Sequence, residues 1–211
     1  MAYEHAQRHI RALQLAKSCV ELGARLKTVA HLTGLSSSLL REYFFNGQPF
    51  VCGRWPDSQD WYHAATLVER AEASLLASIF TTLRSDYACP AQHAMVSAYK
   101  MYRERWTGRP SITFDRAFEL ISRLEGIWTH RAPQLEMHTC LLCQSRHVIA
   151  LGDLSAAHAP CVFCRLVKRY ATDSRIQARF TFKPGWDLPA ARRQRLDYLL
   201  GAEQSLKATR H

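Results

Sequence analysis

The chain has 211 residues, of which 47% are hydrophobic, and its formal net charge is +10 at pH 7. This length and composition predict one domain of ordinary size with a small appendage. The longest purely apolar stretches, such as Leu75–Ala77, are far too short to span a membrane, and Met1–Arg11 lacks the apolar run of a signal peptide.

The cysteine count indicates the redox compartment. Seven cysteines, an odd number, occur in a chain with no expected export signal, which predicts a cytoplasmic protein with reduced thiols. Cys19, Cys52 and Cys89 stand among apolar neighbours and are expected to be buried or half-buried.

The positive charge is concentrated at the C-terminal end. Residues 165–211 contain 11 Lys and Arg against 4 Asp and Glu, whereas residues 1–164 contain 17 against 14. Such an excess favours a polyanionic partner, and nucleic acid is the expected one. Acidic membrane lipid is the alternative, but no amphipathic helix opposes bulky apolar residues to the basic ones.

A first helix is expected from about His5 to Leu22, with its apolar face formed by Ile10, Leu13, Ala16 and Val20. After Gly23, the segment Leu26–Phe44 predicts two short helices around a sharp turn at Gly34, with Ser36 as N-cap of the second. The shared core of this pair is expected to contain Val29, Leu35, Leu40 and Tyr43.

Residues 25–45 therefore have the pattern of a helix-turn-helix, here called the helical corner. In that interpretation the outward positions early in the second helix would contact DNA, and they are Ser36, Ser37, Ser38 and Arg41. The alternative is an ordinary corner between two helices that never touches DNA.

Further helices are expected in the middle of the chain. A long helix capped by Asp57 or Ser58 would bury a stripe formed by Trp61, Ala65, Val68, Ala71, Leu75, Ile79 and Leu83. A second would contain Ala94–Tyr102 and stop near Gly108, and a third would run from about Thr113 to Trp128. No phosphate loop, nucleophile elbow or paired-acid pattern occurs, so we expect no enzymatic activity.

Two cysteine pairs predict a metal site. Cys140 and Cys143 are separated by two residues, as are Cys161 and Cys164, with 17 residues between the pairs. Each pair can present two sulfurs on one side of a turn, and four thiolates saturate a tetrahedral Zn²⁺ without an open position. The pattern predicts one structural zinc per chain.

Other uses of these cysteines remain open. One pair alone could be a redox dithiol, although no strand–helix–strand pattern flanks it, and two disulfides would need an oxidising compartment. His138, His147 and His158 lie close by and could replace one sulfur or support the ligands.

The segments around the cysteine pairs complete the plan. Residues 147–151 predict a strand between the pairs, and basic residues follow the last cysteine, of which Arg165, Lys168 and Arg169 are candidate DNA contacts. The predicted organisation is mainly α: a helical domain over residues 1–130, a zinc-binding module over 131–183, here called the four-cysteine module, and a basic tail over 184–211. Arg192, Arg193 and Arg195 lie in this tail, which would be a short helix or disordered until bound.

At this point the chain resembles a known family, the flagellar transcriptional activator FlhC. The resemblance extends from about residue 5 to about residue 170, through motifs in a fixed order: Leu22–Leu26, Asp60–Trp61, Ala98–Tyr102, Arg116–Phe118 and the two cysteine pairs. It implies a cytoplasmic DNA-binding activator of flagellar operons that assembles with FlhD, holds one zinc through its four cysteines, and acts with RNA polymerase on promoter double-stranded DNA.

Two other functions remain to be weighed against this one. The chain could be a zinc-containing interaction module that binds RNA polymerase or an acidic partner, while the partner supplies the DNA contacts. A zinc deaminase would need a His-x-Glu ahead of its Pro-Cys-x-x-Cys, and Pro160–Cys164 has no such motif before it.

Overall fold

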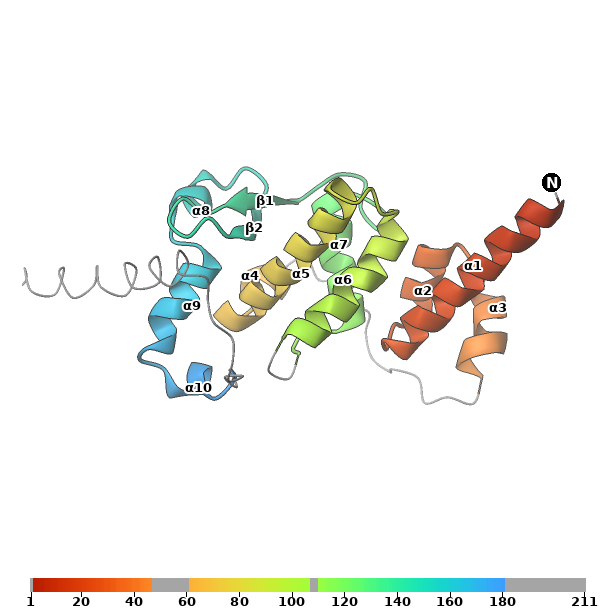
Figure 1. Ribbon diagram of the computed structural model, residues 1–211, viewed down its shortest axis with the longest axis horizontal. Helices are drawn as coiled ribbons and strands as arrows, with labels where there is room; N and C mark the ends of the chain where they lie inside the picture. Colours follow the sequence, from red (N-terminus) through yellow and green to blue (C-terminus); the bar gives the residue numbers. More distant parts are fainter. Residues whose placement is uncertain (1, 47–60, 107–109, 181–211) are drawn as a thin grey trace, which may run out of the picture.

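Three groups of elements follow one another along the long axis of the molecule (Figure 1). The computed structural model describes residues 2–46, 61–106 and 110–180. The N-terminal helices lie at one end, a layer of longer helices lies in the middle, and a two-stranded sheet with short helices forms the other end (Figure 1). The prediction of a mainly α protein is confirmed, and no helix among the described residues is long and apolar enough to cross a membrane.

The N-terminal group contains α1 (Ala2–Glu21), α2 (Leu26–Thr33), α3 (Ser37–Leu40) and the π-helical turn η1 (Arg41–Phe45). The turn of the helical corner forms as predicted. Gly34 is left-handed, with φ 70°, and its N–H donates to the carbonyl of Ala30 at 2.9 Å. Ser36 caps α3 by accepting a hydrogen bond from the N–H of Leu39 at 3.4 Å.

Two of the apolar residues assigned to the N-terminal core are in fact exposed. Val29 and Leu40 are fully buried, but Tyr43 is 62% exposed and Ile10 is 53% exposed. The wider π turn after Leu40 rotates the following side chains, so Phe45 is buried where Tyr43 was expected. Ile10 lies on the part of α1 that extends beyond its neighbours (Figure 1).

The middle group contains α4 (Trp61–Ala64), α5 (Leu67–Ser85), α6 (Ala91–Arg105) and α7 (Phe114–Glu125). The prediction of one long helix from residue 58 to 83 is wrong, because the chain breaks after α4 and restarts. Thr66 and Glu69 form a capping box, in which the N–H of Thr66 donates to Glu69 Oε2 at 2.8 Å and the N–H of Glu69 donates to Thr66 Oγ1. The predicted caps Asp57 and Ser58 lie outside the described residues.

The buried face of α5 also differs from the prediction. Val68 and Ala71 are buried as expected, but Leu75, Ile79 and Leu83 are half-buried. The most deeply buried apolar residues of α5 are Ala73, Leu76, Ala77 and Phe80. This displacement arises because α5 packs against α6 on one side and against the sheet and α9 on another, which a single stripe does not anticipate.

Helix α7 is shorter than predicted. It ends at Gly126, which is left-handed with φ 66°, and a Cβ there would lie 2.6 Å from the backbone nitrogen of Pro133. Trp128 therefore lies beyond the helix, yet its ring stacks on Phe118 with centroids 4.9 Å apart.

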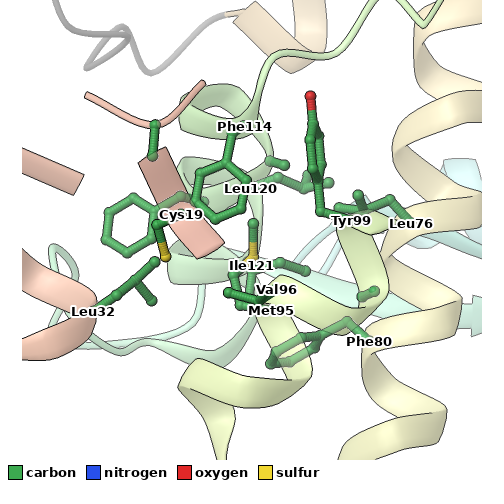
Figure 2. Packing of buried hydrophobic residues seen from close by; sticks show 14 of the residues in the cluster. Cys19, Leu32, Leu76, Phe80, Met95, Val96, Tyr99, Phe114, Leu120 and Ile121 are labelled. Carbon is green, nitrogen blue, oxygen red and sulfur yellow. The ribbon is translucent and has the colours of Figure 1, made fainter. Parts of the chain in front are cut away.

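One apolar core joins the N-terminal group to the middle group. Figure 2 shows Cys19 and Leu32 beside Met95, Phe114 and Ile121. Burial of Cys19 and half-burial of Cys89 agree with the prediction, and Cys52 lies outside the described residues. The same core reaches Leu135 and Val148 near the other end of the molecule, so the strands of that end share it.

A buried carboxylate also ties the helical corner to the middle layer. Asp115, in the first turn of α7, accepts hydrogen bonds from the N–H of Arg25 at 3.1 Å and from Oγ1 of Thr28 at 2.5 Å. Nε of Arg25 lies 3.4 Å from the same carboxylate. Asp115 thus satisfies free backbone and side-chain donors at the start of α2.

The C-terminal group contains β1 (Leu135–Thr139), β2 (Arg146–Ala150), α8 (Leu154–His158), α9 (Val162–Tyr170) and α10 (Ser174–Gln177). The strands are antiparallel, with Leu135 opposite Ala150. The strand predicted over residues 147–151 is thereby confirmed to within one residue, whereas β1 was not anticipated. The predicted domain boundaries at 130 and 183 stay predictions, and the tail 184–211 lies outside the described residues.

Candidate metal centre and nucleic-acid interface

The first cysteine pair lies on the tight turn between β1 and β2. The N–H of Cys140 donates to the carbonyl of Ser145 at 3.0 Å, and the N–H of Gln144 donates to the carbonyl of Cys140 at 2.9 Å. Gln144 has φ 59°, a left-handed conformation that closes the turn. This local folding holds the sulfurs of Cys140 and Cys143 on one side of the hairpin.

The second pair begins α9. Cys161 is the N-cap of this helix, and its sulfur accepts a hydrogen bond from the N–H of Cys164 at 3.4 Å. Cys164 lies in the first helical turn, so both sulfurs are presented at the helix start. A helix N-terminus stabilises negative charge, and it therefore favours the thiolates that a metal needs.

The two pairs meet in space. All four sulfurs lie within 4.8 Å of one another; the Sγ atoms of Cys140 and Cys164 are 3.9 Å apart and those of Cys143 and Cys161 are 3.5 Å apart. Four sulfurs at about 2.3 Å from one zinc would be about 3.8 Å apart, and a disulfide would need about 2.05 Å. The geometry fits a shared tetrahedral metal and contains no disulfide between these cysteines.

The protonation of the sulfurs shows what a metal would have to displace. Burial acts to raise the pKa of Cys140, but backbone N–H groups of Cys143, Cys161 and Leu142 outweigh it and lower the pKa to about 7. Burial raises the pKa of Cys161 to about 12 and also raises that of Cys164. Metal binding must therefore release protons from at least two thiols at neutral pH.

The histidines considered as ligands are not part of the sulfur cluster. Among the described residues, the group placed to share a metal consists of the four cysteines alone. His158 Nδ1 is within 2.8 Å of the carbonyl of Leu154 in its own helix. His138 and His147 face each other across the strands, with ring centroids 5.6 Å apart.

The candidate DNA contacts are all exposed, but they form two separate surfaces. Ser36, Ser37, Ser38 and Arg41 lie on the outer side of the helical corner. Arg165, Lys168 and Arg169 lie on α9. Figure 1 places α3 and α9 at opposite ends of the molecule, with the middle helices between them. One surface therefore cannot extend the other locally, and contact through both would require DNA to follow the length of the molecule.

Sequence reasoning missed the groups that dock the four-cysteine module onto the helices. The hydroxyl of Tyr62 donates to the carbonyl of Val148 at 2.7 Å, and the N–H of Val148 donates to Oγ of Ser74 at 3.2 Å. Arg123 of α7 donates through Nη1 to Oε1 of Gln134 at 2.7 Å, just before β1. No spacing pattern reveals such pairs, because each joins residues that the fold alone brings together.

Comparison with known proteins identifies the group to which the chain is related. The family model described as "Flagellar transcriptional activator (FlhC)" matches residues 1–177. The flagellar transcriptional regulator FlhC of Sodalis glossinidius is 30% identical over 79% of this chain and 88% of its own length. The FlhC proteins of Burkholderia lata and Variovorax paradoxus are 29% and 26% identical, over 73% and 74% of this chain and 70% and 75% of their own lengths.

The match covers the helical corner, the middle helices and all four cysteines. It agrees with the resemblance found in the sequence motifs, and its members are transcriptional regulators rather than enzymes. The chain belongs to the FlhC family of flagellar transcriptional activators.

Proposed function

We propose that this chain activates flagellar operons by binding promoter double-stranded DNA in a hetero-oligomer with FlhD in the cytoplasm. RNA polymerase would be recruited to the assembled complex. One Zn²⁺ per chain, held by Cys140, Cys143, Cys161 and Cys164, would order the C-terminal end. Zinc is the metal that four thiolates in a closed tetrahedron favour.

The placement of α9 carries this proposal. The helix starts on Cys161 and presents Arg165, Lys168 and Arg169 to solvent within its following turns. Residues three and four apart share one helix face, so these three side chains form a basic stripe. Because the sulfurs that bind the metal also anchor the helix start, the metal would orient the stripe toward phosphates.

The helical corner supplies a second candidate surface. Ser36, Ser37, Ser38 and Arg41 are exposed at the start of its second helix, where hydroxyls and a guanidinium suit phosphates or base edges. The short α3 and the exposed Tyr43 also suit a protein partner, so the corner is the weaker of the two DNA candidates.

Footprinting of the co-purified complex with FlhD on a flagellar promoter tests the proposal. We expect protection that is lost with a zinc chelator and weakens steeply as salt rises, because phosphate contacts release counterions. A flat salt response would remove the basic stripe as a phosphate-binding surface.

A gel shift with the chain alone, with FlhD alone and with both separates the proposal from the alternative interaction module. Variants of Arg165, Lys168 and Arg169 should weaken DNA binding by the complex. If they leave DNA affinity unchanged while FlhD alone protects the same site, this chain is an adaptor and FlhD supplies the contacts.

A further inference from the structure

A cavity of about 130 Å³ lies where the four-cysteine module meets the helical layer. Its walls come from α4 and the start of α5, from β2, from the segment leading into and through α8, and from the first turn of α9. The residues that matter for its chemistry are Arg70, Arg165, His63, His147 and Asp153.

Two of these residues carry buried polar atoms without a partner. Nε of Arg70 and both ring nitrogens of His147 are inaccessible to solvent and have no hydrogen-bond partner in the part of the chain that the structure describes. His147 is only 2% exposed. Buried donors of this kind are nearly always satisfied, so unpaired donors lining one cavity indicate an absent acceptor.

The guanidinium of Arg70 is already held in place. Its Nη2 donates to the carbonyl of His63, and its central carbon lies 5.9 Å from the centre of the Tyr62 ring. These contacts leave the Nε edge for another acceptor. Burial lowers the pKa of His147, so its neutral ring still offers one N–H.

The charge of the walls favours an anion. Arg70 and Arg165 are positive, and the N-terminal end of the nine-residue α9 adds partial positive charge. Asp153 and Cys161 oppose them. The Asp153 carboxylate is already occupied by the N–H of Ala156 at 3.0 Å and by Oγ of Ser155 at 2.7 Å. The sulfur of Cys161 is directed into the metal cluster.

We propose that this cavity binds a phosphate group, held by Arg70, Arg165 and the ring of His147. The geometry suits a tetrahedral oxyanion, because guanidinium groups from α5 and α9 approach it from both sides of the junction. The bound phosphate links the four-cysteine module to the helical layer. It is either free inorganic phosphate or a backbone phosphate of DNA, and the second case deepens the DNA-binding function proposed above.

The first measurement uses the full-length, zinc-loaded complex with FlhD. Its thermal midpoint is recorded in sodium phosphate and in sodium chloride at equal ionic strength, and phosphate affinity is measured by calorimetry. We expect phosphate-specific stabilisation. Arg70→Gln or Arg165→Gln should weaken phosphate binding by about tenfold, the usual effect of losing one charge-assisted hydrogen bond.

Arg169→Gln is the matched control, because it removes one positive charge from the same helix outside the cavity. It should leave phosphate affinity unchanged. Arg165 is exposed, so its substitution should leave zinc content and unfolding unchanged. Equal losses in all three variants would mean a general charge effect and would overturn the proposal.

Promoter DNA distinguishes the two sources. If Arg70→Gln weakens DNA binding more than Arg169→Gln does, the occupant is a backbone phosphate; if only free phosphate binding falls, it is the inorganic ion. No phosphate-specific stabilisation, together with equal DNA affinity in both variants, means that only water fills the cavity and the proposal is wrong. A wild-type complex that binds no promoter DNA would defeat the proposed function instead, while the phosphate measurement still decides the cavity.

Discussion

The helical corner and the four-cysteine module carry the two candidate DNA surfaces, but they are stabilised in different ways. The corner buries Val29, Leu32 and Leu40 in the main apolar core. Around the sulfurs of the module, by contrast, the buried cluster consists of Cys140, Cys161 and Cys164, with Cys143 and Phe163 packed against it. A segment with so little apolar material depends on other bonds, and a metal shared by four sulfurs is the usual solution.

The comparison also concerns exposure. The module leaves Leu141, Leu142, Leu151 and Leu154 each more than half exposed. In the corner, the exposed large side chain is Tyr43, which the π turn rotates outward. We therefore expect the two regions to respond to different perturbations: the module to loss of metal and low pH, and the corner to loss of apolar volume.

The largest effect should come from Cys161→Ala. Zinc binding at four-thiolate sites is worth on the order of 10–16 kcal/mol in small peptides, and most of that should be lost with one ligand. We expect loss of zinc by elemental analysis and rapid amide exchange over β1, β2 and α9, while α1 and α2 keep their protection. Cys89→Ala is the control, because Cys89 is half-buried and lies outside the sulfur cluster. Retention of one full equivalent of zinc in Cys161→Ala would refute the ligand assignment.

The second effect is a fall in zinc affinity as the pH falls. The thiols of Cys161, with a pKa of about 12, and of Cys164, with a raised pKa, are protonated at pH 8 and must lose protons to bind metal. Two released protons make the affinity fall roughly a hundredfold per pH unit. Below the Cys140 pKa of about 7, a further proton competes and the slope steepens. Competition with a chromogenic chelator between pH 6 and 8 measures this, and a pH-independent affinity would contradict it.

A third effect should appear in the corner alone. Leu40 is fully buried, so Leu40→Ala should lower the free energy of unfolding by about 2–5 kcal/mol through lost burial and a cavity. Zinc content should not change. Leu151→Ala, at a site 57% exposed, is the control and should shift stability by less than about 0.5 kcal/mol in urea titrations. A Leu40→Ala chain that loses zinc would show that the two regions are coupled more closely than their separate packing indicates.

The smallest effect concerns the junction between the corner and the middle layer. Asp115→Asn keeps an acceptor for Thr28 but removes the charge opposite Arg25, which should cost about 1–3 kcal/mol. Asp86→Asn, at an exposed site after α5, is the control. Urea unfolding measures both, and amide exchange should show α2 opening before α5. Equal stability of the two variants would mean that Asp115 merely fills space.

Local patterns in the chain were sufficient for much of the fold and for the four sulfurs. Cysteine spacing is a local property, and each Cys-x-x-Cys turn can form from its own residues, so the cluster was predictable. The same is true of the Gly34 turn and the Ser36 cap, which depend on residues within four positions. The strand over 146–150 and the helices α6 and α7 also followed from periodicity.

The predictions that were wrong share one physical cause. Burial at Ile10, Tyr43 and Leu75 depends on which neighbours cover each face, and the break before α5 depends on competition between helix propagation and the capping box at Thr66. These outcomes are set by packing between segments, so a helical period alone does not determine them.

The amino-acid sequence by itself determined a mainly helical protein with two cysteine pairs, a helical corner and a basic C-terminal end, because spacing and composition act within a few residues. Only the tertiary structure brought Asp115 to the start of α2, seated Val148 on Ser74 and Tyr62, and gathered Arg70, His147 and Arg165 around one cavity. Those contacts join residues many positions apart. Their formation depends on the free energy of the whole packed core, which no local pattern contains.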